Sequence, residues 1–163
     1  MITEESLLRP IEFLTDTLCE GRAMHSRGSV EASAWIAREF DHIGLVPLSS
    51  PYIAGTVRPP LSFIRSFRSS GKIGRNVIGL SPASGHSEEY IIVAAHFDNL
   101  GVLSGRYYPG ADSNASGVSA LLNLAHAFRS LGVLGHAAGR NVLFVALDGK
   151  QMSMAGASSL YDS

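Results

Sequence analysis

Two uninterrupted apolar runs, at residues 90–95 and 142–147, constrain the fold of this chain more than any other feature. Continuous apolar runs of this length are typical of strands that are covered on both faces. Between them, apolar residues recur at helical spacing from about residue 115 to residue 130, which predicts a helix with one apolar face. The order strand, helix, strand predicts two parallel strands joined by a right-handed crossover.

The rest of the chain predicts further elements of the same kind. Thr3 is a suitable cap for a first helix, and Gly44 is a suitable stop for a second one. The other expected elements are the helix at residues 29–43, an edge strand at 61–67 and a strand at 76–80. We therefore expect an α/β fold, a three-layer α/β/α sandwich with a mixed, mainly parallel sheet, in which residues 1–163 form a single domain.

The composition excludes several classes of protein. Apolar residues make up 45% of the chain and charged residues 17%, which is typical of a globular protein and not of a disordered one. The net charge of −1 gives no field that would attract nucleic acid, so no nucleic-acid partner is expected. No segment approaches the ~20 apolar residues of a membrane span. The single cysteine, Cys19, excludes an internal disulfide and lies at the apolar spacing of a helix, where we expect it to be buried.

The first residues leave the cellular compartment open. Met1-Ile2-Thr3-Glu4-Glu5 does not have the basic start and apolar run of a signal peptide. A cytoplasmic protein and an exported or periplasmic protein whose signal was removed would both have such a sequence.

Residues that can do chemistry follow the predicted strands. They are His96 and Asp98 after the first apolar run, Asp112 in the loop before the helix, and Asp148, Lys150 and Gln151 after the second run. Because ligands of open α/β sheets bind at the carboxyl ends of the strands, we expect these side chains to converge on one edge. Imidazole and carboxylate together suit Zn²⁺, with Asp98 better placed to orient His96 than to bind metal. The spacing alone also fits a histidine bonded in a turn and an aspartate that caps the helix.

Several segments carry a resemblance to a known family. They are Leu18-Cys19-Glu20-Gly21-Arg22-Ala23, Glu39-Phe40-Asp41-His42-Ile43-Gly44-Leu45, Asn76-Val77-Ile78-Gly79, the strand that ends in His96-Phe97-Asp98, and Gly110-Ala111-Asp112-Ser113-Asn114. In this order they resemble the zinc-dependent aminopeptidases, a family that includes bacterial leucyl aminopeptidases and is related to glutaminyl cyclases. The resemblance implies hydrolysis of the amino-terminal bond of a peptide substrate, with two zinc ions as cofactors.

The resemblance also implies roles for individual residues. His96 would bind one zinc ion, Asp112 would bridge the two ions and Asp98 would hold His96. Members of the family can carry a cis peptide bond at the dipeptide that begins with the bridging aspartate, so we predict that the Asp112–Ser113 bond is cis. In the Glu20-Gly21-Arg22 turn, we interpret the two charged residues as a structural clamp between the first helices and the sheet.

The family pattern is broken at Lys150-Gln151. Active members have a Glu-Glu pair there, in which the first glutamate is the general base and the second is a metal ligand. A protonated lysine at residue 150 has no acceptor for a proton, and the neutral amide oxygen of Gln151 is a weak ligand. The family's remaining ligands lie in its later half. We therefore interpret the chain as the amino-terminal part of such a domain, truncated at its C-terminal side, with impaired or absent activity and no durable zinc binding.

Several alternatives stay open at this stage. Asp148 could act as base or ligand if the alignment is shifted. Lys150 could replace the missing cation and pair with Asp112, or it could be a solvated surface lysine. The chain could accordingly be a metallo-aminopeptidase, or a catalytically degenerate binding or interaction module on the same fold. An exposed sheet edge would also favour a homo-oligomer.

Overall fold

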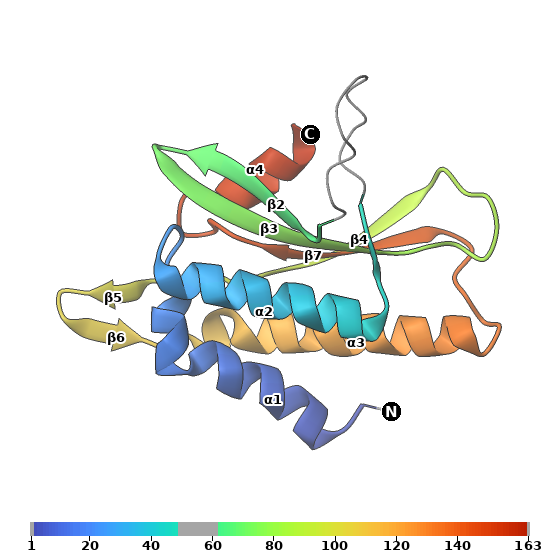
Figure 1. Ribbon diagram of the computed structural model, residues 1–163, viewed down its shortest axis with the longest axis horizontal. Helices are drawn as coiled ribbons and strands as arrows, with labels where there is room; N and C mark the ends of the chain where they lie inside the picture. Colours follow the sequence, from blue (N-terminus) through green and yellow to red (C-terminus); the bar gives the residue numbers. More distant parts are fainter. Residues whose placement is uncertain (1, 49–61, 163) are drawn as a thin grey trace.

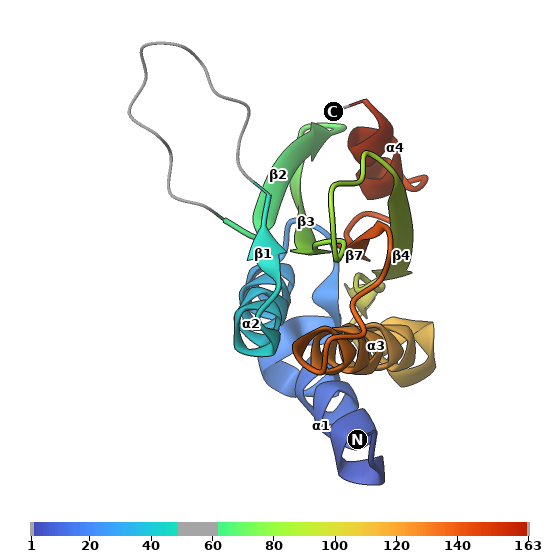
Figure 2. The ribbon, with the colours of Figure 1, turned by 90° about the vertical axis from the view of Figure 1, so that its right-hand side faces the viewer.

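The computed structural model describes residues 2–48 and 62–162, which form one mixed sheet with helices on both faces (Figure 1). Helices α1 (Glu4–Thr15), α2 (Arg27–Ile43) and α3 (Ser116–Val133) lie on one face, and α4 (Ala155–Tyr161) lies on the other (Figure 2). This arrangement confirms the expected three-layer α/β/α sandwich. None of the helices in the described part of the chain is long and apolar enough to cross a membrane.

The sheet has the order β1-β3-β7-β4, and β2 also pairs with β3. The strands are β1 (Val46–Pro47), β2 (Ile64–Ser69), β3 (Lys72–Ser81), β4 (Tyr90–His96) and β7 (Asn141–Leu147), and a separate hairpin contains β5 (Gly101–Leu103) and β6 (Arg106–Tyr108). Strands β4 and β7 are parallel and are joined through α3, as predicted.

The expectation of a mainly parallel sheet does not hold for the described residues. The sheet is mixed, but the β1–β3, β2–β3 and β3–β7 pairings are antiparallel and only β4–β7 is parallel. The two-residue turn Ser70-Gly71 explains part of this difference, because so short a connection can join only antiparallel strands. The β5–β6 hairpin and α4 were not predicted, since both are short.

The two apolar runs differ in how far they are buried. In β7, the side chains of Val142, Phe144, Val145 and Ala146 are at most 1% exposed. In β4, by contrast, Tyr90, Ile91 and Ile92 remain 46–55% exposed. The prediction that both strands are covered on both faces is therefore correct for β7 and wrong for the first half of β4. The reason is that β4 is the outermost strand of the described sheet and pairs only with β7.

The helix ends follow the caps expected from the sequence. The Thr3 side chain accepts a hydrogen bond from the Ser6 N–H and the Ser6 side chain accepts one from the Thr3 N–H, so α1 begins with a capping box. Helix α2 stops at Gly44, which has a φ of 82°. Cys19 is fully buried, as expected, and burial raises the pKa of its thiol to about 11, which leaves it unreactive.

The guanidinium of Arg22 joins three segments that are far apart in the sequence. Its Nε donates to the Phe97 carbonyl at 2.6 Å, and its two terminal nitrogens donate to Pro109 at 2.7 Å, to Gly110 at 2.9 Å and to Leu14. The side chain is completely buried, and burial lowers the pKa of Arg22. Arg22 thus ties the end of α1 and the loop before α3 to the end of β4, which confirms the clamp.

The residues next to Arg22 complete this clamp. Gly21 has a φ of 66°, and a Cβ atom there would stand 2.5 Å from the Tyr108 carbonyl oxygen, so only glycine fits. The Glu20 carboxylate accepts from the Gly28 N–H at 3.2 Å, in the first turn of α2. A carboxylate at this end of a helix is also favoured by the helix dipole.

Removing the Arg22 guanidinium should destabilise the chain strongly. Arg22→Met leaves four carbonyl groups without their donor, so we expect a loss of about 4 kcal/mol in the free energy of unfolding. Arg22→Lys keeps the charge but not the planar fork, and should lose about 2 kcal/mol. Urea unfolding followed by circular dichroism measures both values. The exposed Arg27 provides the matched control, because Arg27→Met should change stability by no more than about 0.5 kcal/mol. Equal losses for the two methionine variants would show that Arg22 is not a clamp.

Candidate functional site

The carboxylate of Asp98 lies beneath the turn that follows β7. Asp98 is completely buried, and its Oδ1 and Oδ2 accept hydrogen bonds from the backbone N–H groups of Lys150 and Gln151, both at 3.0 Å. The two strand ends are also joined directly, because the Phe97 N–H donates to the Leu147 carbonyl at 2.8 Å. The structure therefore brings the segments after β4 and β7 together, as the sequence predicted.

His96 stands at the last position of β4 and is held from two sides. Its Nδ1 lies 3.1 Å from the backbone carbonyl of Asp98 and 3.6 Å from the Asp98 carboxylate, while its own carbonyl accepts from the Asn114 side chain at 3.2 Å. A carbonyl oxygen can only accept, so this contact places a proton on Nδ1 and leaves the lone pair of neutral His96 on Nε2. The nearest partner of the ring is thus the Asp98 backbone. Orientation of His96 by the Asp98 carboxylate stays a prediction.

The loop that carries Asp112 differs from the prediction in two details. The cis peptide bond is Ser113–Asn114, so the prediction of a cis Asp112–Ser113 bond is wrong by one position. Asp112 does not cap α3 either, because it is the Asn114 side chain that accepts from the Gly117 N–H in the first turn of that helix, at 3.2 Å. The Asp112 side chain is exposed and has no polar partner among the described residues.

Lys150 does not pair with Asp112. The ion pairs within residues 2–48 and 62–162 are Arg9–Glu39 and Arg140–Glu89, and the 3.6 Å contact of His96 with Asp98 is ionic only when the imidazole is protonated. Lys150 and Asp112 are both exposed, where a pair of charges gains less than about 1 kcal/mol. The hypothesis that the ammonium replaces a missing metal is therefore wrong, and the solvated lysine is the correct interpretation.

Asp148 is buried in the interior and does not face His96. Its Oδ2 accepts from the Ser29 hydroxyl at 3.1 Å and from the Arg75 N–H at 3.0 Å, and its Oδ1 accepts from the Gly149 N–H at 2.8 Å. The Arg75 N–H lies just beyond the last β3–β7 pair, so Asp148 takes the place of a strand partner. The alternative in which Asp148 acts as base or metal ligand does not fit this geometry.

Two polar residues of this region were missed at the sequence level. Asn76 accepts from the Asp148 N–H at 3.1 Å and donates to the Gly156 carbonyl at 2.8 Å, so it links β3 to the end of β7 and to α4. Ser29, in the first turn of α2, supplies the hydroxyl that Asp148 accepts. The signal for Asn76 was present, because it is a polar residue at the start of an otherwise apolar strand segment. Ser29 had no such signal.

The described residues do not by themselves form a metal centre. Zinc sites in proteins use three or four side-chain ligands, and no group of three His, Cys, Asp or Glu side chains within the described parts of the chain could hold a metal ion. His96 also lines a hollow of about 400 Å³ whose other walls are mostly apolar residues of β4 and α3, among them Val93, Leu121 and Leu124. The described residues alone therefore supply too few ligands for the two-zinc centre that the resemblance implies.

Comparison with known proteins identifies relatives of this arrangement. The family model described as "Peptidase family M28" matches residues 76–163. Among curated proteins, the BOS complex subunit NCLN of Gallus gallus is 38% identical over 78 residues, which are 47% of this chain and 14% of that protein. The chain thus spans a small part of the length of this relative.

Solved structures show the same fold at low sequence identity. LapB from Legionella pneumophila matches 96% of this chain with a TM-score of 0.65 and 24% identity, and the match covers 37% of LapB. The Tannerella forsythia glutaminyl cyclase matches 90% of this chain with a TM-score of 0.64 and 16% identity, over 47% of its own length. A leucine aminopeptidase precursor from Bacteroides thetaiotaomicron matches 89% with a TM-score of 0.61 and 19% identity, over 46% of its length.

The buried carboxyl group of Asp148 should make stability depend on pH. Burial, aided by the nearby charge of Asp98, raises its pKa from 3.8 to about 6. Between these values the folded chain binds more protons than the unfolded chain, so stability from this group is fully present below about pH 4 and is lost as the pH rises through about 6. We expect the free energy of unfolding of the wild type, relative to that of Asp148→Asn, to fall by about 2 kcal/mol between pH 4 and pH 7.

Urea unfolding of both proteins at several pH values measures this difference. Ser29→Ala removes a donor to the ionised carboxylate, so it should move the midpoint of the pH dependence upward. A stability difference between wild type and Asp148→Asn that is the same at every pH would contradict the prediction.

Proposed function

Because the chain belongs to peptidase family M28, we propose that it forms part of a metallopeptidase-like hydrolase domain in which peptide-bond hydrolysis is impaired or absent. The family match runs from the middle of β3 through α4 and so includes His96, Asp112 and Lys150-Gln151. Membership accounts for the hydrolase fold. The loss of activity is our inference from the residues at the end of β7.

The observation that carries this proposal is the Lys150-Gln151 turn. Hydrolysis of a peptide bond needs a group that accepts a proton from the attacking water. A lysine ammonium at residue 150 has only protons to donate, and the Gln151 side chain is a neutral amide. The two nearby buried carboxylates do not substitute for a base, since Asp98 binds the backbone of the turn and Asp148 binds α2 and β3.

The ligands available for a metal support the same proposal. Zinc, which the family resemblance implies, would find the Nε2 atom of His96, the exposed carboxylate of Asp112 and the weak amide oxygen of Gln151. The last two lie on exposed residues. If the protein is active with residues supplied from elsewhere, its substrate would be a peptide with a free amino terminus.

A second candidate function is a non-catalytic binding module on the same fold. Two observations favour it. The curated relative is by its name a subunit of a complex, and its similarity to this chain is 38% over 78 residues. In addition, β4 exposes Tyr90, Ile91 and Ile92 along an edge without charged residues, and such an edge favours pairing with another chain. Under this proposal a homo-oligomer is one result to look for by light scattering.

Hydrolysis and zinc binding test the proposal directly. We expect the wild-type chain to release no p-nitroaniline from leucine p-nitroanilide above the background rate, with or without added zinc. Calorimetric titration should detect no zinc binding at micromolar affinity. Lys150→Glu combined with Gln151→Glu supplies two carboxylates beside His96, so zinc affinity should rise by about tenfold.

The matched control is Arg38→Glu, which adds negative charge on the exposed side of α2 and should leave zinc affinity unchanged. Micromolar or tighter binding of two zinc ions by the wild type, or measurable aminopeptidase turnover, would refute the proposed loss of activity.

A further inference from the structure

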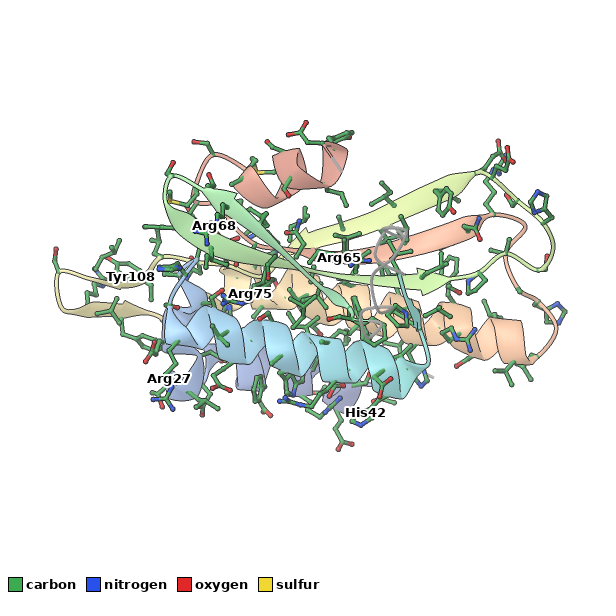
Figure 3. The ribbon with its side chains drawn as sticks, turned by 45° about the horizontal axis from the view of Figure 1, so that its top comes forward. Arg27, His42, Arg65, Arg68, Arg75 and Tyr108 are labelled. Carbon is green, nitrogen blue, oxygen red and sulfur yellow. The ribbon has the colours of Figure 1, made fainter. Side chains whose placement is uncertain are left out.

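Strand β4 forms one border of the sheet in the described part of the chain. Among the described residues it pairs only with β7. In Figure 3 it lies on the side of the sheet away from the β2–β3 hairpin, which carries the labelled residues Arg65, Arg68 and Arg75. The seven residues of β4 include no Asp, Glu, Lys or Arg. A free edge without charge can pair with a strand of another molecule.

Two hydrogen bonds show which backbone groups of β4 face β7. The Glu89 carbonyl accepts from the Asn141 N–H at 3.1 Å, and the Phe97 N–H donates to the Leu147 carbonyl at 2.8 Å. The backbone groups of successive residues in a strand point to opposite sides, so those of odd-numbered residues face β7. The N–H and C=O groups of residues 90, 92, 94 and 96 therefore face the open edge.

An antiparallel pairing of two β4 strands about Val93 uses these outward groups. A hydrogen-bonded antiparallel pair needs two residues whose backbone groups both face the contact. About Val93, Ile92 of one copy lies opposite Ala94 of the other, and both residues have outward groups. The two-fold symmetry repeats this pair on the other side of Val93. At the end of the ladder the His96 carbonyl already accepts from Asn114 at 3.2 Å, so we expect the new backbone bonds at the two inner pairs.

The same register places large side chains opposite small ones. Tyr90, Ile91 and Ile92 make up the first half of β4 and are 46–55% exposed, whereas Ala94 and Ala95 belong to its second half. Because the two strands run antiparallel, the first half of one copy lies against the second half of the other. Ile91 then pairs with Ala95, and Ile92 pairs with Ala94. Such pairs of large and small residues fill a contact without leaving a gap.

A hollow of about 400 Å³ beside the second half of β4 provides room for one of the large side chains. Val93 and Ala95 point toward the core and α3, and Leu121 and Leu124 of α3 line the hollow on this side. Ile91 shares this face, because alternate residues of a strand point the same way. In the pairing about Val93, Ile91 of the second copy lies over Ala95 and next to Leu124, which is 42% exposed.

We propose that two copies of this chain pair through β4, antiparallel and centred on Val93, and form one continuous sheet. A second copy fits better than an unrelated strand, because the backbone register, the side-chain sizes and the absence of charge all match when β4 meets itself. The pairing places Tyr90 of one copy opposite His96 of the other, so the second copy contributes an aromatic side chain beside the candidate site. This inference rests on the second candidate function, in which β4 pairs with another chain.

Size-exclusion chromatography with light scattering tests the dimer. The wild type should be dimeric at micromolar concentration. Ile91→Lys places an ammonium group in the apolar hollow and should raise the dissociation constant by about tenfold or more. Val102→Lys is the matched control, because Val102 lies on β5 and is 57% exposed, so the dissociation constant should not change. Ile92→Pro removes an outward N–H but no bond to β7, so it should also weaken the dimer. Circular dichroism confirms that all three variants remain folded.

Disulfide cross-linking tests the register. Val93 lies at the two-fold axis, where the two Cα atoms of a non-hydrogen-bonded pair are about 4.5 Å apart. Val93→Cys should therefore form a disulfide between two copies on oxidation, and the native Cys19 is fully buried and does not compete. Ile92→Cys is the control, because its two copies are offset by two residues and should cross-link about tenfold more slowly.

Several results would overturn the proposal. They are a monomeric wild type, equal effects of the two lysine variants, cross-linking of Ile92→Cys as fast as that of Val93→Cys, and assembly into particles larger than a dimer. None of these readouts depends on hydrolysis or zinc. A monomeric chain that hydrolyses no substrate would therefore contradict the dimer alone, whereas turnover by a dimeric chain would contradict only the proposed loss of activity.

Discussion

The arrangement of this molecule depends on one buried cation. Arg22 donates to carbonyl groups at the end of α1, at the end of β4 and in the loop before α3, and its side chain has no exposure to water. Burying a guanidinium is costly unless every donor is used, so these segments are held in one relative position. The loop that contains Asp112 and the strand that ends in His96 are therefore brought together by a residue that belongs to neither of them.

Two buried carboxylates, those of Asp98 and Asp148, hold the segments that follow β4 and β7. Asp98 and Asp148 follow neighbouring parallel strands and are both buried, yet each has separate partners. Asp98 binds the turn after β7, and Asp148 binds α2 and β3. Mutual repulsion contributes to the raised pKa of Asp148. Backbone N–H groups donate to both carboxylates and offset part of the cost of burying them.

The parts of the fold that follow from local pattern could be predicted from the sequence. The β4–α3–β7 unit, the caps at Thr3 and Gly44 and the convergence of His96, Asp98 and Lys150 all depend on periodicity and strand ends. What could not be predicted depends on three-dimensional neighbours. Strand β4 is exposed because it lies at the edge of the described sheet. Asp112 and Lys150 do not pair because both are exposed to solvent. The position of the cis bond is determined by the backbone torsions of the loop.

The turn after β7 is held in place by main-chain atoms of its residues. Three successive N–H groups, those of Gly149, Lys150 and Gln151, bind the two buried carboxylates, in the manner of a backbone nest that holds an anion. The chain supplies that anion itself and uses only main-chain atoms of residues 150 and 151. The side chains at these two positions are consequently free of any folding requirement. Substitutions of the side chains at residues 150 and 151 are therefore expected to leave the contacts of the buried carboxylates, and the architecture around them, unchanged.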